Sequence, residues 1–207
     1  MLSCTSNSVS LIPGASAANA KGIVHEYINI GDTYFSLGKY DKAADYYKLA
    51  LSDKENYWAV YYKLAKTYIA QSKWSDAKPI FEDILKRDPQ NASIKASLAF
   101  IHIKLGEYDQ ALSIYDELNN SDKSQSEYLQ NTISIHLLKE DLEQASSNFE
   151  LLKELYPDCQ NIEKFESAIN ELKKKKEEAE KLEVSGATET TDSDKTLENE
   201  SEVPVEA

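Results

Sequence analysis

The sequence predicts an all-α protein in which helix pairs stack into a right-handed α-solenoid, with one further helix covering the C-terminal end of the stack. Alanine recurs at a spacing of 34 residues, at Ala43, Ala77, Ala111 and Ala145. A large aromatic residue follows each alanine at the same offset, at Tyr47, Phe81, Tyr115 and Phe149. A fixed period of this length is typical of solenoids, because each unit must bury its apolar side against the next. With only six Gly and five Pro in 207 residues, a turn-rich sheet fold is disfavoured.

Residues 1–23 are rich in Ser, Ala and Asn and show no helical period, so we expect a flexible lead-in. Its Met-Leu-Ser-Cys start resembles the lipidation site of a bacterial lipoprotein, but no basic and apolar signal precedes Cys4 in this sequence. Two alternatives stay open. If the chain is complete, Cys4 is incidental and the protein is cytoplasmic; if the true start lies upstream, Cys4 is lipidated and the protein belongs to the bacterial envelope.

Four units follow without insertions, at residues 24–57, 58–91, 92–125 and 126–159. Each opens with apolar residues at helical spacing, such as Tyr27, Ile30 and Tyr34 in the first unit. We therefore expect one helix of about four turns at the start of each unit, followed by a second helix that carries the recurring alanine.

Short polar breaks separate the two helices of a unit. Gly38 and Gly106 suit the left-handed residue that ends a helix. Asp41, Ser75 and Asp109 follow these breaks, and we expect their side chains to cap the next helix.

The C-terminal part changes character twice. Residues 160–183 continue one apolar stripe and then become highly charged, which predicts a capping helix whose distal half extends into water. The stripe consists of Ile162, Phe165, Ile169 and Leu172. Residues 184–207 contain seven acidic side chains and the single Lys195, so we expect a disordered acidic tail.

Composition narrows the function. The formal net charge of −13, from 36 acidic and 23 basic residues, disfavours nucleic acid and anionic membranes as partners. No apolar run approaches the roughly 18 residues that would predict a transmembrane helix. Cys4 and Cys159 form neither a CxxC pair nor a metal-ligand spacing.

We find no pattern that predicts catalysis. His102 and His136 occupy the place that Tyr34 and Tyr68 take in the first two units, which favours an aromatic packing site. A two-histidine metal site is the weaker alternative, since no third ligand is in view. A glycine-rich phosphate loop and a Ser/His/Asp arrangement are also missing, so we expect neither enzyme activity nor a cofactor.

The units resemble the tetratricopeptide repeat. The resemblance covers residues 24–159 and is most specific in the first three units. It depends on a pattern of small and large residues, met in the first unit by Gly31, Tyr34, Ala43, Tyr47 and Ala50. The fourth unit departs from the pattern, because Thr132 and Ile133 stand where a large apolar residue and then a small one are expected.

The resemblance implies a binding groove lined by the first helix of each unit. It places these residues in the groove: Ile28, Asp32, Phe35, Tyr62, Lys66, Ile69, Ala96, Phe100 and Ile103, followed in the fourth unit by Gln130, Ser134 and Leu137. The Lys and Asn clamp that some family members use for C-terminal carboxylates is replaced, for example by Ile28 and Asp32. We therefore expect a protein-interaction scaffold that binds an apolar peptide or helix; the alternative is a lipid-anchored envelope protein that assists outer-membrane or periplasmic assembly.

Overall fold

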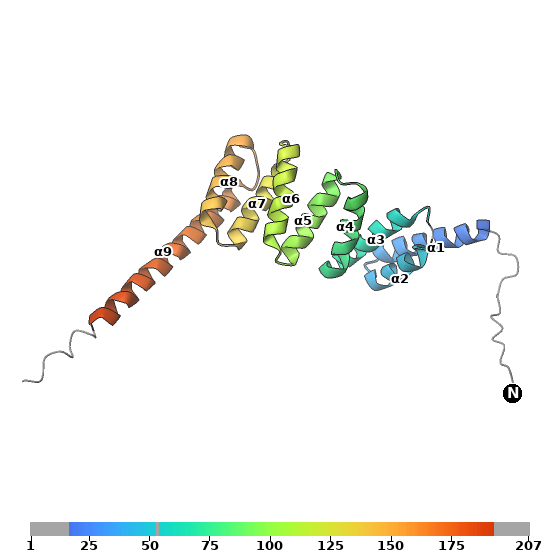
Figure 1. The fold of residues 1–207 in the computed structure, drawn as a ribbon, viewed down its shortest axis with the longest axis horizontal. Coiled ribbons are helices and arrows are strands. Elements are labelled where there is room, and N and C mark those ends of the chain that lie inside the picture. Colours follow the sequence, from blue (N-terminus) through green and yellow to red (C-terminus); the bar gives the residue numbers. More distant parts are fainter. Residues whose placement is uncertain (1–16, 53, 193–207) are drawn as a thin grey trace, which may run out of the picture. The chain divides into compact units, whose positions relative to one another are not determined.

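The computed structural model describes residues 17–52 and 54–192, and the side chains of residues 22–52 and 54–182. Every regular element in the described ranges is a helix, which confirms the predicted all-α solenoid fold of paired helices (Figure 1). Cys4 lies outside the described residues, as do the first 16 residues of the lead-in and residues 193–207 of the acidic tail. The helices are α1 (Ala17–Ser36), α2 (Tyr40–Ala50), α3 (Tyr57–Ala70), α4 (Trp74–Arg87), α5 (Ala92–Lys104), α6 (Tyr108–Ser121), α7 (Ser126–Leu138), α8 (Leu142–Leu155) and α9 (Ile162–Asp192).

Two helices extend further than the sequence indicated. Helix α1 begins at Ala17, so residues 17–23 are helical although we expected a flexible lead-in. Their sequence, AANAKGI, contains three alanines, the residue with the highest helix propensity. Helix α9 continues past residue 183 into the segment predicted to be disordered. Adding residues to an existing helix avoids the cost of nucleation, which explains this extension.

The chain divides into two compact units, residues 1–114 and 115–207, with the boundary inside α6. In the first unit, α1 packs on α2, α2 on α3, α3 on α4 and α4 on α5. Its core contains the recurring small and large residues: Ala43 and Ala77 have no exposed surface, and Tyr47 and Phe81 are buried beside them. The small alanines let neighbouring helices approach closely, and the aromatic rings fill the space between pairs.

The second unit has its own core. Helix α7 pairs with α8, and α9 packs on both. Phe165, Ile169 and Leu172 of α9 are buried, whereas residues 173–182 are exposed. The proximal part of α9 therefore covers this helix pair, and residues 173–182 lie in solvent.

All four first helices end with the same backbone hydrogen bonds. After α1, the amide of Gly38 donates to the carbonyl of Phe35 at 3.0 Å, and the amide of Lys39 donates to the carbonyl of Tyr34 at 2.8 Å. This is the Schellman motif, which requires a left-handed residue. Gly38 and Gly106 adopt φ values of 69° and 75°, as predicted.

In the second and fourth repeats, residues 58–91 and 126–159, the left-handed position is not a glycine. Ser72 and Glu140 adopt φ values of 57° and 55°, and the same pair of backbone hydrogen bonds recurs at each. A left-handed conformation is unfavourable for a residue with a Cβ atom. These two turns are therefore strained relative to the glycine turns.

The predicted caps lie two residues beyond the N-cap positions of α2 and α4. Helix α2 begins at Tyr40 and α4 at Trp74, so Asp41 and Ser75 are inside the first turn, and Lys39 and Lys73 hold the N-cap positions without side-chain cap bonds. The reason is that the Schellman turn leads directly into the next helix. Asp109 likewise lies in the first turn of α6. Asp41 and Asp109 therefore act as negative charges near the positive end of the helix dipole.

We expect Ser72→Gly and Glu140→Gly each to increase the free energy of unfolding by about 0.5–1 kcal/mol. Relief of the left-handed strain outweighs the greater freedom of glycine in the unfolded chain. Urea unfolding followed by circular dichroism measures the effect. Gly38→Ala provides the opposite control: no atom lies within 4 Å of an added Cβ, so only backbone strain acts, and stability should fall. A loss of stability in Ser72→Gly and in Glu140→Gly would contradict this account of the turns.

Candidate peptide-binding face

Nine of the twelve residues predicted to line a groove lie in the first compact unit, on α1, α3 and α5. We call the surface that they form the candidate face. None of the nine is fully buried: Lys66 and Phe100 are exposed, and the other seven are half-buried. Their assignment to a binding site stays a prediction. The residues are Ile28, Asp32, Phe35, Tyr62, Lys66, Ile69, Ala96, Phe100 and Ile103.

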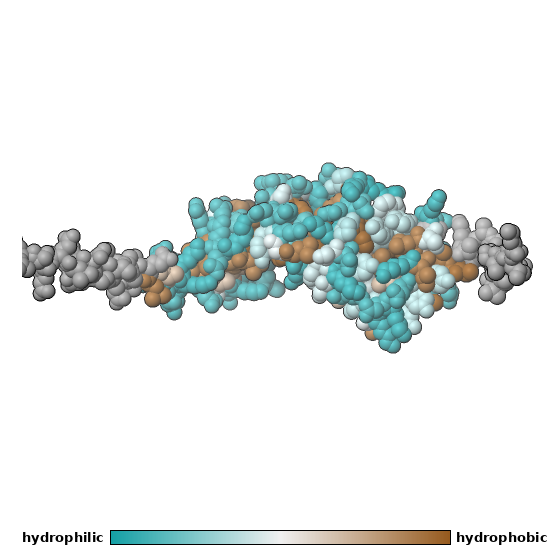
Figure 2. All heavy atoms as spheres, turned by 60° about the horizontal axis from the view of Figure 1, so that its bottom comes forward, coloured by the Kyte–Doolittle hydropathy of each residue, from teal (hydrophilic) through white to brown (hydrophobic). Residues whose placement is uncertain are grey.

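Part of the candidate face also supports the core. Ile28, Phe35, Tyr62 and Ile69 pack against the buried cluster of the first unit with one side and remain partly accessible on the other. On the side of the molecule shown in Figure 2, apolar patches interrupt a mostly hydrophilic surface. Such side chains contribute to stability and are also available for contact with another molecule.

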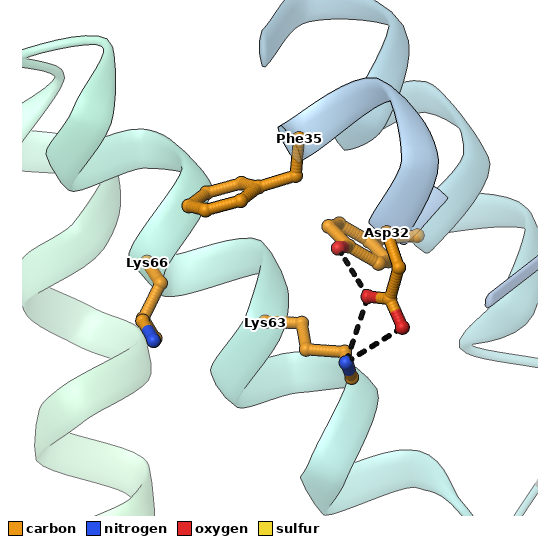
Figure 3. Close-up of a pocket in the computed structure, with 5 residues that line it drawn as sticks. Asp32, Phe35, Lys63 and Lys66 are labelled. Carbon is orange, nitrogen blue, oxygen red and sulfur yellow. Dashed lines mark hydrogen bonds and ion pairs between the residues drawn. The ribbon is translucent and has the colours of Figure 1, made fainter. Parts of the chain in front are cut away.

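Residues of α1 and α3 line a small pocket of about 90 Å³. Asp32, Phe35, Lys63 and Lys66 line it, together with Tyr47 from α2 (Figure 3). The Asp32 carboxylate accepts hydrogen bonds from the Tyr47 hydroxyl at 2.7 Å and from Lys63 Nζ at 2.7 and 2.9 Å. Both carboxylate oxygens are therefore used inside the protein.

Tyr47 is held in place from two sides. Its side chain is only 2% exposed, and burial raises the pKa of its hydroxyl, with the hydrogen bond to Asp32 raising it further. The hydroxyl therefore stays protonated and donates a hydrogen bond to Asp32. On the other side, a Cβ atom at Gly31 would lie 2.7 Å from Tyr47 Cε1, so the ring occupies space that the glycine leaves open.

Two aromatic–lysine pairs lie further along the candidate face. Lys66 Nζ lies 5.8 Å from the centre of the Tyr62 ring on α3. Lys104 Nζ lies 5.1 Å from the centre of the Phe100 ring on α5. Phe100 also meets Trp74 edge-on at 5.7 Å and remains 40% exposed. The same arrangement, an aromatic ring with a lysine one helical turn later, thus occurs on two successive first helices.

The remaining predicted residues are not drawn into these clusters. Ala96 and Ile103 are half-buried on α5 and do not line the pocket. Gln130, Ser134 and Leu137 belong to the second unit and are half-buried there. The Gln130 carboxamide oxygen accepts a hydrogen bond from Asn161 at 2.7 Å, so it has a partner within its own unit.

Sequence reasoning missed Lys63 and Lys104 on this surface, and it treated Tyr47 only as a packing residue. A signal for Lys63 existed. Lys63 follows Asp32 by 31 residues, which is one repeat less one helical turn, so opposite charges face each other on neighbouring first helices. Lys104 follows Phe100 by four residues, the spacing at which helix side chains meet.

The second unit contains a larger pocket that the sequence did not indicate, with a volume of about 330 Å³. Residues of α6, α7 and α8 line it, and it combines carboxamides with partly exposed leucines. The Tyr156 hydroxyl donates a hydrogen bond to the carbonyl of Lys123, and both residues line the pocket. The lining residues are Asp116, Asn119, Asn120, Lys123, Leu129, Asn148, Leu151, Leu155 and Tyr156.

His102 and His136 each lie close to a carboxylate of the turn that follows their own helix. His102 is buried, and its Nδ1 lies 2.6 Å from Glu107 Oε2, to which Lys78 Nζ also donates at 2.6 Å. These hydrogen bonds, that of Lys78 first, lower the pKa of Glu107. His136 Nδ1 lies 3.5 Å from Asp141 Oδ2. Each histidine thus contacts a neighbouring acid within its own unit.

Within the described part of the chain, no three His, Cys, Asp or Glu side chains gather in a way that could ligate a metal ion. The described helices also include none with the length and apolar character needed to cross a membrane.

Comparison with known families decides the classification. Two profiles described as the tetratricopeptide repeat match residues 26–52 and 69–131. The chain is a tetratricopeptide-repeat protein. The matched segments include Ala43, Tyr47, Ala77 and Phe81, the residues at the recurring alanine and aromatic positions of the first two repeats.

Solved structures with the same fold include three bacterial proteins. A tetratricopeptide-repeat protein from Parabacteroides merdae is 18% identical, with a TM-score of 0.64, over 81% of this chain and 67% of its own. Residues 41 to the end of MamA from Desulfovibrio magneticus are 17% identical, with a TM-score of 0.59, over 70% and 81%. PilF from Pseudomonas aeruginosa is 23% identical, with a TM-score of 0.53, over 72% and 68%. At these identities the likeness concerns the fold. The search of curated proteins finds no matching sequence.

Proposed function

We propose that this tetratricopeptide-repeat protein is a non-catalytic scaffold whose candidate face binds a peptide or a helix of a partner protein. The repeat fold supports a role in protein–protein interaction. The observation that carries the proposal is Phe100, 40% exposed on a helix whose other side is already buried. Leu98, Ile101 and His102 provide the buried side of α5. A helix of a soluble protein needs one apolar side for packing, so a second calls for another explanation.

The arrangement favours an elongated ligand. Tyr62 and Phe100 lie one turn apart in repeat position on α3 and α5, and each ring meets an aromatic ring of α4, which packs between these two helices. A partner segment crossing α3 and α5 would meet both rings. Aromatic side chains are enriched among the residues that contribute most to binding free energy at interfaces, and an amphipathic helix laid into a groove is a recurrent mode of peptide recognition.

The hydrogen bonds of Asp32 and Glu107 indicate that these two carboxylates have a structural role. Asp32 is engaged by Tyr47 and Lys63, as described above. Glu107 is engaged by Lys78 and His102. Both carboxylates connect one helix pair to the next. Lipid anchoring through Cys4, and with it the envelope location, stays a prediction.

The test uses the full chain and a display library of random peptides about four helical turns long. Peptides enriched on the wild-type chain are synthesised, and their affinity is measured by fluorescence anisotropy for the wild type and for Tyr62→Ala/Phe100→Ala. Because truncation of a binding hot spot costs about 2 kcal/mol or more, we expect the double variant to bind at least about tenfold more weakly.

The control is Tyr46→Ala/Leu49→Ala, which removes one aromatic and one exposed apolar side chain from α2, outside the candidate face. We expect it to bind the selected peptides as the wild type does. Thermal unfolding of both variants shows that they are folded at the temperature of the assay. Equal peptide affinity of the wild type and the Tyr62/Phe100 variant would overturn the proposed function.

A further inference from the structure

Helices α3 and α5, which carry most of the candidate face, differ in the sign of their charge from the whole protein. The chain carries a formal net charge of −13. Helices α3 and α5, however, contain four lysines and no aspartate or glutamate. The lysines are Lys63, Lys66, Lys95 and Lys104. Two of the three first helices in the first unit are therefore positively charged within an acidic protein.

Lys66 and Lys104 are the lysines that remain available to a ligand. Lys63 is committed to Asp32, and Figure 3 shows the Lys66 ammonium group pointing away from that carboxylate. Among the described residues, Lys66 and Lys104 form no ion pair; each ammonium group lies over an aromatic ring, that of Tyr62 or Phe100. Each pair thus offers an apolar ring and an uncompensated positive charge side by side.

Resting on the proposed function, we infer that the partner segment is acidic: it places carboxylates on Lys66 and Lys104 and large apolar side chains on Tyr62 and Phe100. A carboxylate next to an apolar side chain satisfies both halves of each pair. A basic segment would meet two cations, and the one carboxylate of the candidate face, Asp32, is already engaged by Tyr47 and Lys63. Charges more than about 8–10 Å apart are largely screened at physiological salt, so the lysines beside the two rings affect a bound segment more than the net charge of the whole chain does.

The experiment compares three versions of each peptide that the full chain selects from the random library: the selected sequence, one with every Asp and Glu changed to Asn and Gln, and one with them changed to Lys. We expect the selected peptides to be rich in acidic residues beside large apolar ones. Each exposed charge pair is worth up to about 1 kcal/mol, so the amide versions should bind about three- to tenfold more weakly, and the lysine versions more weakly still.

The protein side uses Lys66→Gln/Lys104→Gln, in which the preference for acidic peptides should disappear while the amide versions still bind. Lys42→Gln/Lys48→Gln is the matched control. It removes the same charge from α2, and these lysines also lie over aromatic rings, 5.3 Å from the Tyr34 centre and 5.9 Å from the Tyr68 centre. The control variant should keep the preference.

The outcomes separate this inference from the proposed function. Peptides that need Tyr62 and Phe100 but bind equally well in acidic and amide versions would overturn the inference and leave the function standing. Failure of every peptide to depend on the two rings would overturn both. Exclusive binding of a synthetic peptide of residues 184–207, or of a single-stranded RNA oligonucleotide in place of peptides, would overturn the assignment to an acidic partner protein.

Discussion

Gly31→Ala is expected to destabilise the first unit, although alanine is the better helix former. The added Cβ would lie 2.7 and 2.8 Å from Cε1 and Cδ1 of Tyr47, distances that force the ring or the helix to move. The ring cannot move freely, because it is buried and its hydroxyl is bound to Asp32. Overpacking costs about 1–3 kcal/mol, whereas the gain in helix propensity is about 1 kcal/mol. We therefore expect a net loss of up to about 2 kcal/mol in urea unfolding.

Gly22→Ala is the matched control on the same helix. Gly22 is exposed, and no atom lies within 4 Å of an added Cβ, so only the propensity acts and stability should rise by up to about 1 kcal/mol. In a Tyr47→Leu background the space beside Gly31 opens, and the penalty of Gly31→Ala should shrink or vanish. If both glycine variants stabilise the wild-type protein equally, the Tyr47 ring does not occupy the position described here.

Ala77→Leu is expected to lower the free energy of unfolding by about 1–3 kcal/mol through overpacking. Ala77 lies on α4 with 0% of its surface exposed, at the recurring small position where helices approach closely. The comparison is Ala70→Leu at the exposed end of α3, which adds the same atoms in solvent and should change stability little. Thermal and urea unfolding measure both variants. An unchanged transition for Ala77→Leu would count against the repeat register.

The register of the repeats was accessible from sequence because it is periodic. The recurring alanine and aromatic positions needed no knowledge of contacts, and Gly38 and Gly106 were recognisable because glycine is the usual residue of a left-handed helix end. Ser72 and Glu140 carry no such residue-type signal. Only their alignment with the two glycines reveals that the backbone must take the same turn there, at a cost in strain.

Repeat position places Asp32, Tyr62 and Phe100 on the first helices, and their role in binding stays a prediction. A helical pattern does not say which side chains reach across to the next helix. The Tyr47 hydroxyl is the clearest case. The pattern identifies the ring as a packing residue, whereas its bond to Asp32 depends on the exact separation of α1 and α2. Helix ends were also missed where propensity and continuation decide, as at Ala17.

Because the same turn follows each first helix, a deletion keeps the helices in register only when it removes a whole repeat of 34 residues. Excising residues 58–91 would join Tyr57 to Ala92, both of which begin a first helix, and would preserve the phase of everything downstream. Excising one residue fewer would rotate the following helix by about 100° and present its polar side to the neighbouring pair. We therefore expect the fold to accept the insertion or deletion of whole repeats. Each such change adds or removes one first helix that can contact a ligand.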